Sequence, residues 1–113
     1  PVLLDILTFA SLRFLPRIVR ILIFGSIGIG FRYAVVVQAD ELLALSTVLV
    51  SPTSTGAPAR SFRPTIEIEG KPTRVLVEQT TAISPERLGN SVGRLSAAEL
   101  RDLDAALLVV LGL

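Results

Sequence analysis

The residue types that this sequence lacks limit the chemistry it can perform. The 113-residue chain has no histidine and no cysteine. A Ser-His-Asp triad, an imidazole acid–base pair, a thiolate nucleophile and a zinc–thiolate site are therefore excluded. The polar groups left for a reaction are guanidinium, hydroxyl and carboxylate groups, and no acidic cluster suggests a metal. We expect neither a metal nor another cofactor.

Arg32 is the first candidate for a chemical role. It is a permanently charged, forked hydrogen-bond donor at the start of an apolar, β-branched run, residues 32–38. Two interpretations stay open for such a residue. It is either an ordinary strand-end arginine in a surface ion pair, or an anchor for a phosphate or a charged transition state.

Hydroxyl side chains form the second group of candidates. Ser51, Thr53, Ser54 and Thr55 directly follow a predicted strand, in a stretch whose proline and glycine content is typical of a loop. Such residues often make only local hydrogen bonds to the backbone. The Glu78-Gln79 pair raises a similar question, because a glutamate at the end of a buried strand needs a partner such as arginine.

A glycine-rich stretch, GSIGIG at residues 25–30, precedes Arg32. A dinucleotide site requires glycines in the order G-x-G-x-x-G between a strand and a helix, and a phosphate-binding loop requires a lysine followed by serine or threonine. Neither pattern is present, since the order here is G-x-x-G-x-G and Phe31-Arg32 follows. The stretch instead favours a mobile β-hairpin loop that lets a ligand approach the backbone closely.

The elements that must position these residues are short strands followed by a helix. Apolar or alternating runs bounded by turn residues predict five strands, at residues 17–24, 32–38, 45–50, 65–69 and 74–79. Their short spacing is typical of a small barrel rather than of alternating strands and helices. A brief helical turn is expected at residues 84–89. The capping box Ser96-Ala-Ala-Glu99 begins a final helix, 96–111, whose apolar stripe packs on the barrel.

The first 16 residues form a separate apolar segment that we expect to be helical and to end at Pro16. The longest charge-free run near this end, residues 21–31, has eleven residues, about half of what a membrane-spanning helix needs. We therefore expect a cytoplasmic protein with no membrane role, organised as this segment plus one domain over residues 17–113.

A net charge of only +1 indicates that any nucleic-acid site is local. The apolar surface favours a homodimer.

The motifs occur in the order found in a known family. Residues 25–37, GSIGIGFRYAVVV, resemble the G-S-E-Q-G-G-x-R-P-A-V-V-V stretch of the MazF/PemK toxins. Residues 49–54 resemble that family's strand before a threonine-containing loop, and residues 75–79 resemble its D/E-Q strand. The similarity continues through Arg87-Leu88-Gly89 and Gly93-Arg94-Leu95-Ser96 to the C-terminal helix, and spans about residues 25–113.

The resemblance implies a mainly β fold, an SH3-like small barrel with a C-terminal helix, that acts as a homodimer. It implies a growth-inhibiting toxin of a toxin–antitoxin system, a metal-independent mRNA interferase that cleaves single-stranded RNA by attack of the 2′-hydroxyl. An antitoxin with an acidic and apolar tail is the expected protein partner. By position, Arg32 and Thr53 are the catalytic pair, and Glu78 is a supporting residue. The residues expected to bind RNA are Ser26, Gly28, Gly30, Tyr33, Ser54 and Gln79.

Two features leave alternatives open. The family's usual R-G-D/E-x-W/Y opening is absent, and Ile27 and Ile29 replace polar loop residues. Toxins of the same fold also act by binding and inhibiting DNA gyrase, which would need no Arg32–Thr53 pair and would use the end of the C-terminal helix. A third possibility is an inactive homologue that only binds an antitoxin.

Overall fold

The computed structural model describes residues 18–23, 31–39, 42–43 and 45–113, with the backbone alone for residues 18–23, 31 and 32. The predicted helix within residues 1–16 and the glycine-rich loop at residues 25–30 lie outside these residues. No helix in the described part of the chain is long and apolar enough to span a membrane.

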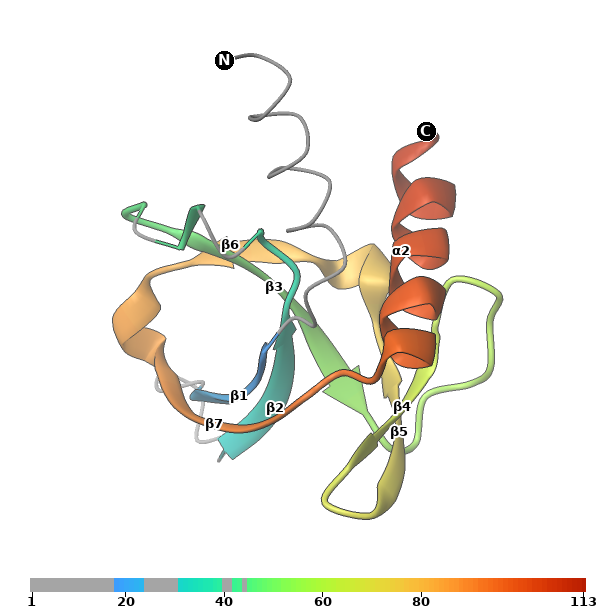
Figure 1. Ribbon diagram of the computed structural model, residues 1–113, viewed down its shortest axis with the longest axis horizontal. Coiled ribbons are helices and arrows are strands. Elements are labelled where there is room, and N and C mark those ends of the chain that lie inside the picture. The colour runs from blue at the N-terminus through green and yellow to red at the C-terminus, as the bar shows by residue number, and fades with distance from the viewer. Residues whose placement is uncertain (1–17, 24–30, 40–41, 44) are drawn as a thin grey trace.

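The described residues form a strongly curved antiparallel sheet with one long helix beside it (Figure 1). Along the sheet the strand order is β4-β5-β3-β2-β1-β7, and β6 pairs with β3 away from this path. The predicted mainly β fold with a C-terminal helix is therefore confirmed. The strands are β1 (Ile18–Ile23), β2 (Phe31–Val36), β3 (Val48–Ser54), β4 (Thr65–Ile68), β5 (Lys71–Val75), β6 (Thr81–Ile83) and β7 (Leu88–Arg94).

The second half of β2, Ala34-Val35-Val36, is buried on both faces, which explains why these three consecutive residues are all apolar. Val35 belongs to a core cluster that includes residues of the C-terminal helix, whereas Ala34 and Val36 belong to a second cluster with Val48 and Val50 of β3. Alternation of side chains along a strand sends neighbouring residues to opposite faces. Two small cores thus lie on either side of the β2–β3 pair and fix its position.

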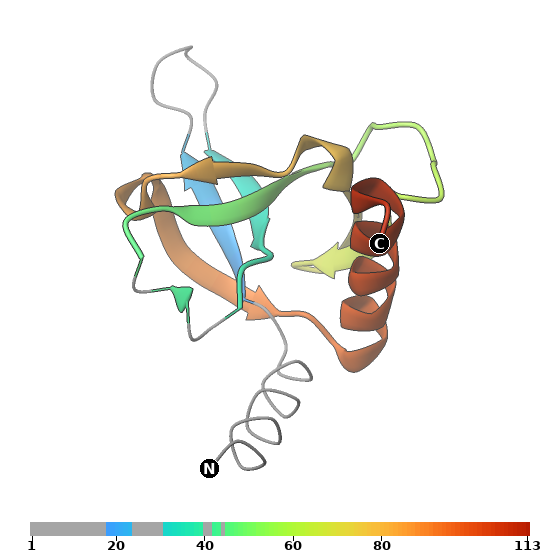
Figure 2. The same cartoon turned by 90° about the horizontal axis from the view of Figure 1, so that it is seen from above.

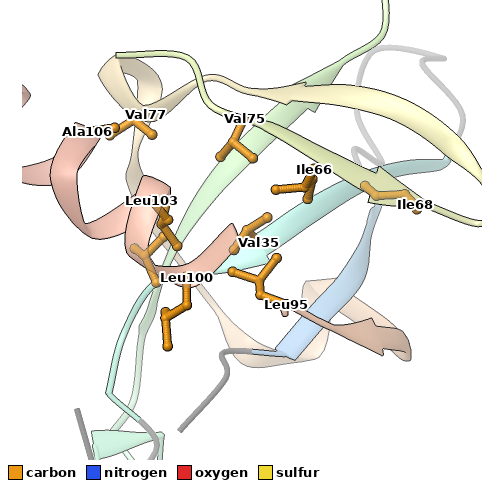
Figure 3. Close-up of a cluster of buried hydrophobic side chains, with 10 residues drawn as sticks. Val35, Ile66, Ile68, Val75, Val77, Leu95, Leu100, Leu103 and Ala106 are labelled. Carbon is orange, nitrogen blue, oxygen red and sulfur yellow. The ribbon is translucent and has the colours of Figure 1, made fainter. Parts of the chain in front are cut away.

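Helix α2 (Ala97–Leu111) covers the first core. Leu100 and Leu103 point from the helix toward Val35, and Ala106 lies beside Val77 in the same cluster (Figure 3). The predicted capping box is present, because the Ser96 hydroxyl accepts a hydrogen bond from the Glu99 N–H and Glu99 accepts one from the Ser96 N–H. The second carboxylate oxygen of Glu99 accepts from the Glu67 N–H at 2.7 Å and so joins the helix start to the edge of β4.

Several predicted boundaries were wrong. Strand β3 begins later than expected and continues through Ser54, so Ser51, Thr53 and Ser54 are in a strand, and only Thr55 of the hydroxyl residues is in the loop. Strand β5 ends at Val75 and is followed by η2 (Val77–Gln79), a 3-10 turn, where a strand was expected. The helical turn expected at residues 84–89 is present but shorter, as the 3-10 turn η3 (Pro85–Arg87), and the Ser84 side chain does not cap it.

Strands β6 and β7 were not predicted. Strand β7 has the sequence LGNSVGR, with two glycines and no apolar alternation. It forms because it pairs with β1, in a register that runs from Ile18↔Arg94 to Leu22↔Leu88 with two irregularities. The expected five strands therefore become seven in the described part of the chain. Figure 2 shows β7, in orange, beside β1, in blue.

The β4–β5 hairpin turns at Glu69 and Gly70, so the strand expected at residues 65–69 ends one residue early. Both turn residues have positive φ, 50° for Glu69 and 80° for Gly70. Two successive residues of this kind fit the right-handed twist of a two-residue hairpin. Glycine adopts this conformation freely, whereas for glutamate it is uncommon.

Candidate functional site

The candidate site lies near the end of β3, where the pairing of this strand changes from β2 to β5. Its middle pairs with β2, with Ala34 opposite Pro52, and its end pairs with β5, with Thr53 opposite Val75. A strand held from both sides has little freedom to shift. Thr53 and Ser54, expected in a loop, are therefore presented by rigid backbone.

A cavity of about 380 Å³ opens at this junction. Its volume is within the range of small-ligand sites. Among the described residues its wall is rich in hydroxyl groups and includes one charged side chain, from Lys71. The described residues of the wall are Tyr33, Thr53, Ser54, Thr55, Ile68, Lys71 and Thr73.

Thr53 is held in one orientation at this wall. It is only 7% exposed, and its hydroxyl donates a hydrogen bond to the backbone carbonyl of Tyr33 at 2.7 Å. Because the hydroxyl proton is used in this bond, the oxygen's lone pairs are the part left for a ligand. A donor group, such as a sugar hydroxyl, fits this arrangement directly, whereas a phosphate oxygen requires the Thr53 proton to turn.

Tyr33 is held by the hairpin that faces it across the cavity. Its phenol donates a hydrogen bond to a carboxylate oxygen of Glu69 at 2.9 Å. This hydrogen bond, followed by partial desolvation and the negative charge of Glu69, raises the pKa of Tyr33 above its ordinary value. The phenol is therefore protonated at neutral pH, and its ring stays at the cavity wall.

Arg32 lies at the same end of the β2–β3 pair as Thr53. Its Cα is opposite Leu22 of β1, and it precedes by two residues Ala34, the partner of Pro52. The structure thus brings the backbone positions of the two predicted catalytic residues to one end of the sheet. The Arg32 side chain lies outside the described atoms, as do residues Ser26, Gly28 and Gly30 of the predicted RNA-binding loop.

Glu78 and Gln79 lie on η2 and are not in the wall of this cavity. The predicted arginine partner of Glu78 is present, because Arg63 Nε donates to both carboxylate oxygens at 3.0 and 3.1 Å. This ion pair ties the loop after β3 to η2, and a bond from Arg63 to the Pro58 carbonyl strengthens the same tie. Glu78 therefore has a structural partner in place of free access to the cavity.

Three residues near the cavity were missed by the sequence reasoning. Lys71 and Thr73 come from β5, and Glu69 lies at the tip of the hairpin. The one sequence signal was the polar–apolar alternation at residues 65–69, which predicts a strand with one buried face. That signal did not show that residues of the hairpin line the same cavity as Thr53.

A second cavity, of about 480 Å³, is mainly apolar and has Val77 and Glu78 of η2 in its wall. Strand and helix residues meet in its wall, including Leu49, Glu78 and the last turns of α2. Close to it, Leu108, Val109 and Leu111 are at least half exposed. The described residues contain no group of three or more acidic side chains that could hold a metal ion.

Comparison with known proteins gives the same fold. The chain superposes on the Mycobacterium tuberculosis toxin MazF-mt6 with a TM-score of 0.75 and 20% identity, over 86% of this chain and 98% of that one. It superposes on a mycobacterial endoribonuclease solved with its cognate antitoxin with a TM-score of 0.71 and 16% identity, over 87% and 93% of the chains. It superposes on a MazE–MazF structure from Deinococcus radiodurans with a TM-score of 0.70 and 20% identity, over 85% of this chain and 92% of that one.

Sequence comparison places the chain in a family. It is 38% identical over 85 residues to Rv3098A, a candidate toxin of Mycobacterium tuberculosis (strain ATCC 25618 / H37Rv), which covers 74% of this chain and 79% of that protein. Residues 22–111 match the family described as the PemK-like, MazF-like toxins of type II toxin–antitoxin systems. The match includes the strands that form the cavity and the helix that covers the first core, and the chain belongs to this toxin family.

Proposed function

We propose that this toxin is a metal-independent endoribonuclease that cleaves single-stranded RNA at a short sequence. The observation that supports it best is Thr53, a nearly buried hydroxyl fixed at the wall of a hydroxyl-rich cavity, at the same end of the β2–β3 pair as Arg32. Two proteins with solved structures of the same fold are endoribonucleases of mycobacterial species.

The reaction uses the RNA's own 2′-hydroxyl as the nucleophile. The O2′ atom attacks the neighbouring phosphorus, the bond from phosphorus to O5′ breaks, and the products are a 2′,3′-cyclic phosphate and a 5′-hydroxyl. O2′ loses one proton and O5′ gains one, so neither water nor metal is consumed. The guanidinium of Arg32 stabilises the charge of the phosphorane, a contribution of the kind worth about 3 kcal/mol.

The geometry of Thr53 suggests how the nucleophile is oriented. With its proton donated to the Tyr33 carbonyl, Thr53 Oγ1 accepts a hydrogen bond from the 2′-hydroxyl or, after rotating, donates one to a phosphate oxygen. Tyr33 and Ser54 lie in the same wall and contact the flanking nucleotide. Single-stranded bases are recognised by stacking and by hydrogen bonds to their edges, which a phenol ring and a hydroxyl can supply.

The other predicted contacts belong to the same proposal. Ser26, Gly28 and Gly30 close over the RNA from the glycine-rich loop, and Gln79 contacts RNA beyond the cavity, with Glu78 as its support. An antitoxin with an acidic and apolar tail inhibits the toxin by covering Arg32. Complexes of toxin and antitoxin are known for two of the similar proteins.

A homodimer is the second part of the proposal. The apolar cavity and the exposed end of α2 form a continuous surface around Leu49, Val110 and Leu111. Large exposed apolar patches are uncommon on monomers. A second copy of the chain covers this surface.

The test is incubation of the pure chain with single-stranded RNA in EDTA, followed by mapping of the RNA ends. We expect 2′,3′-cyclic phosphate and 5′-hydroxyl ends at a short common sequence. Arg32→Ala should lower the cleavage rate about 10²- to 10³-fold, the effect of losing one transition-state donor. The control Arg101→Ala removes the same charge from the exposed side of α2 and should cleave at the normal rate.

Cleavage that needs a divalent metal, or that is unchanged in Arg32→Ala, would contradict the mechanism. Absence of cleavage together with retention of a DNA gyrase subunit on the immobilised chain would favour the gyrase-binding alternative. That alternative also predicts that substitutions at the exposed end of α2, rather than at Arg32, abolish binding of the gyrase subunit.

A further inference from the structure

We propose that the β4–β5 hairpin forms an RNA subsite in which Lys71 binds the phosphate next to the scissile one, while Glu69 holds the Tyr33 ring against the adjoining nucleotide. This inference rests on the proposed ribonuclease function. It adds Glu69 and Lys71 to the residues that contact or position the substrate, and neither was expected from the sequence motifs.

The strand register shows that Lys71 is on the inner face of the hairpin. Lys71 is directly opposite Ile68, and Thr73 is opposite Ile66. Paired residues lie on the same face of a sheet. Ile66, Ile68 and Thr73 are all at most 5% exposed, so this is the face toward the core.

The side chain of Lys71 is exposed, and its place on this face directs it into the cavity rather than into the core. Lys71 lies next to the hairpin turn, where its side chain lines the 380 Å³ cavity together with the Thr53, Ser54 and Thr55 hydroxyls. Of the carboxylates in the described residues, none forms an ion pair with it. An ammonium group among hydroxyls, without a described counter-charge, is a combination that suits a phosphate.

The tip of the same hairpin fixes the aromatic side of the cavity. Glu69 adopts an uncommon positive φ, and from this position its carboxylate accepts the phenol hydrogen bond of Tyr33, a residue 36 positions earlier. The bond joins β2 to the hairpin across the cavity. A ring held in this way loses less freedom when a base stacks on it.

These contacts assign different roles along the RNA. Thr53 and Arg32 act at the scissile phosphate, Lys71 binds the neighbouring phosphate by charge, and the Tyr33 ring supports a base. Glu69 contacts no RNA atom in this arrangement and is a positioning residue.

A competing interpretation is that the aliphatic stem of Lys71 only covers Ile68. The Lys71→Met variant distinguishes phosphate binding from simple covering of Ile68, because methionine retains an unbranched apolar stem and lacks the charge. The measurement is the Kd of each variant for a non-cleavable, 2′-deoxy-substituted single-stranded RNA at several salt concentrations. Arg101→Ala is the matched control for loss of one positive charge.

We expect Lys71→Met to weaken binding about 5- to 10-fold at low salt, the effect of losing one charge-assisted contact. The slope of log Kd against log salt should fall by about 0.7, the value for one phosphate of a single strand. Lys71→Arg should keep the slope, and Arg101→Ala should change neither quantity. Melting temperatures of the variants should agree, since the stem is retained.

Glu69 is tested by a double-mutant cycle. Tyr33→Phe and Glu69→Ala should each weaken binding to a similar extent, and the double variant should be no weaker than either single one, because both remove the same hydrogen bond. Additive effects would contradict the positioning role.

The failure of this inference is distinguishable from failure of the proposed function. If the wild-type chain binds and cleaves RNA while Lys71→Met retains both its Kd and its salt slope, the phosphate subsite is wrong and the ribonuclease proposal stands. If the wild-type chain neither binds nor cleaves RNA, both are wrong.

Discussion

At the scale of single residues, the hydroxyl of Thr53 and the phenol of Tyr33 are the best-defined groups of the candidate site. Each makes one short hydrogen bond to a fixed partner, at 2.7 and 2.9 Å. Their positions beside Ser54 could be anticipated, because the motif order placed all three near Arg32. The position of Lys71 in the cavity wall could not, since it depends on where the β4–β5 hairpin turns.

The RNA cleavage rate should fall when Thr53 loses its hydroxyl group and should stay nearly unchanged when it loses its methyl group. We expect Thr53→Val to lower the RNA cleavage rate about 10²-fold, the lower end for a fixed transition-state contact, and Thr53→Ser to stay close to wild type. Thr53→Val should also lower the free energy of unfolding by about 1 kcal/mol, because the Tyr33 carbonyl loses its hydroxyl donor. Cleavage assays and urea titration measure the two effects, and equal rates for Val and Ser would contradict the assignment.

Tyr33 provides a pH prediction that can be read by absorbance, because it is the chain's only tyrosine and there is no tryptophan. Its raised pKa means that the protonated phenol is favoured in the folded state. This stabilisation is fully present below the ordinary pKa of 10.0 and is lost as the pH rises through the higher folded value. Titration at the tyrosinate band should give a midpoint above 10.0, and Glu69→Ala should lower it. An unchanged midpoint in that variant would contradict the Tyr33–Glu69 contact.

At the scale of elements, prediction succeeded where the local pattern and the final contacts agree. The capping box at Ser96 and the alternation at residues 65–69 both specify their elements locally, and both are present. Strand β7 could not be found in this way, since its glycine-rich sequence becomes a strand only by pairing with β1. The same limit applies to Glu78 and Gln79, which lie on η2 and not in the wall of the cavity, because β5 ends three residues before Glu78.

Glu99 is expected to stabilise two elements with one side chain. Its carboxylate accepts from the Ser96 N–H at 2.8 Å and from the Glu67 N–H at 2.7 Å. Glu99→Ala should lower the free energy of unfolding by about 2 kcal/mol, since both the cap and the tie to β4 are lost. Urea denaturation measures this, with Arg101→Ala in the same helix as the control. A loss no larger than that of the control would show that the two bonds contribute nothing.

The two ends of α2 should respond differently to truncation. Leu103 is fully buried in the first core, whereas Leu108 is 50% exposed. Leu103→Ala should cost about 3 kcal/mol of unfolding free energy, as for other buried leucines, and Leu108→Ala less than about 1 kcal/mol within one chain. The apolar stripe predicted from the sequence is therefore divided, with its first half in the core and its second half open to a partner. Thermal or urea unfolding at low protein concentration tests the difference.

At the scale of the whole molecule, this open half of α2 is the proposed dimer surface. Leu111→Glu places a charge there and should convert a dimer to a monomer, because an unpaired charge is costly to bury. Analytical ultracentrifugation across a concentration series measures the mass, with Arg101→Glu as a control that should remain dimeric. A monomeric wild-type chain, or a dimeric Leu111→Glu variant, would contradict the proposal.

The hydrogen bond from Thr53 to Tyr33 has a consequence for how such a toxin can diversify. The acceptor is the backbone carbonyl of residue 33, and every amino acid supplies that carbonyl. The Thr53 anchor therefore does not depend on which side chain occupies position 33, where the related toxins have proline. If the proposed ribonuclease function is correct, selection can change the side chain at position 33, and with it the nucleotide that is preferred, while the hydrogen bond that anchors Thr53 is retained.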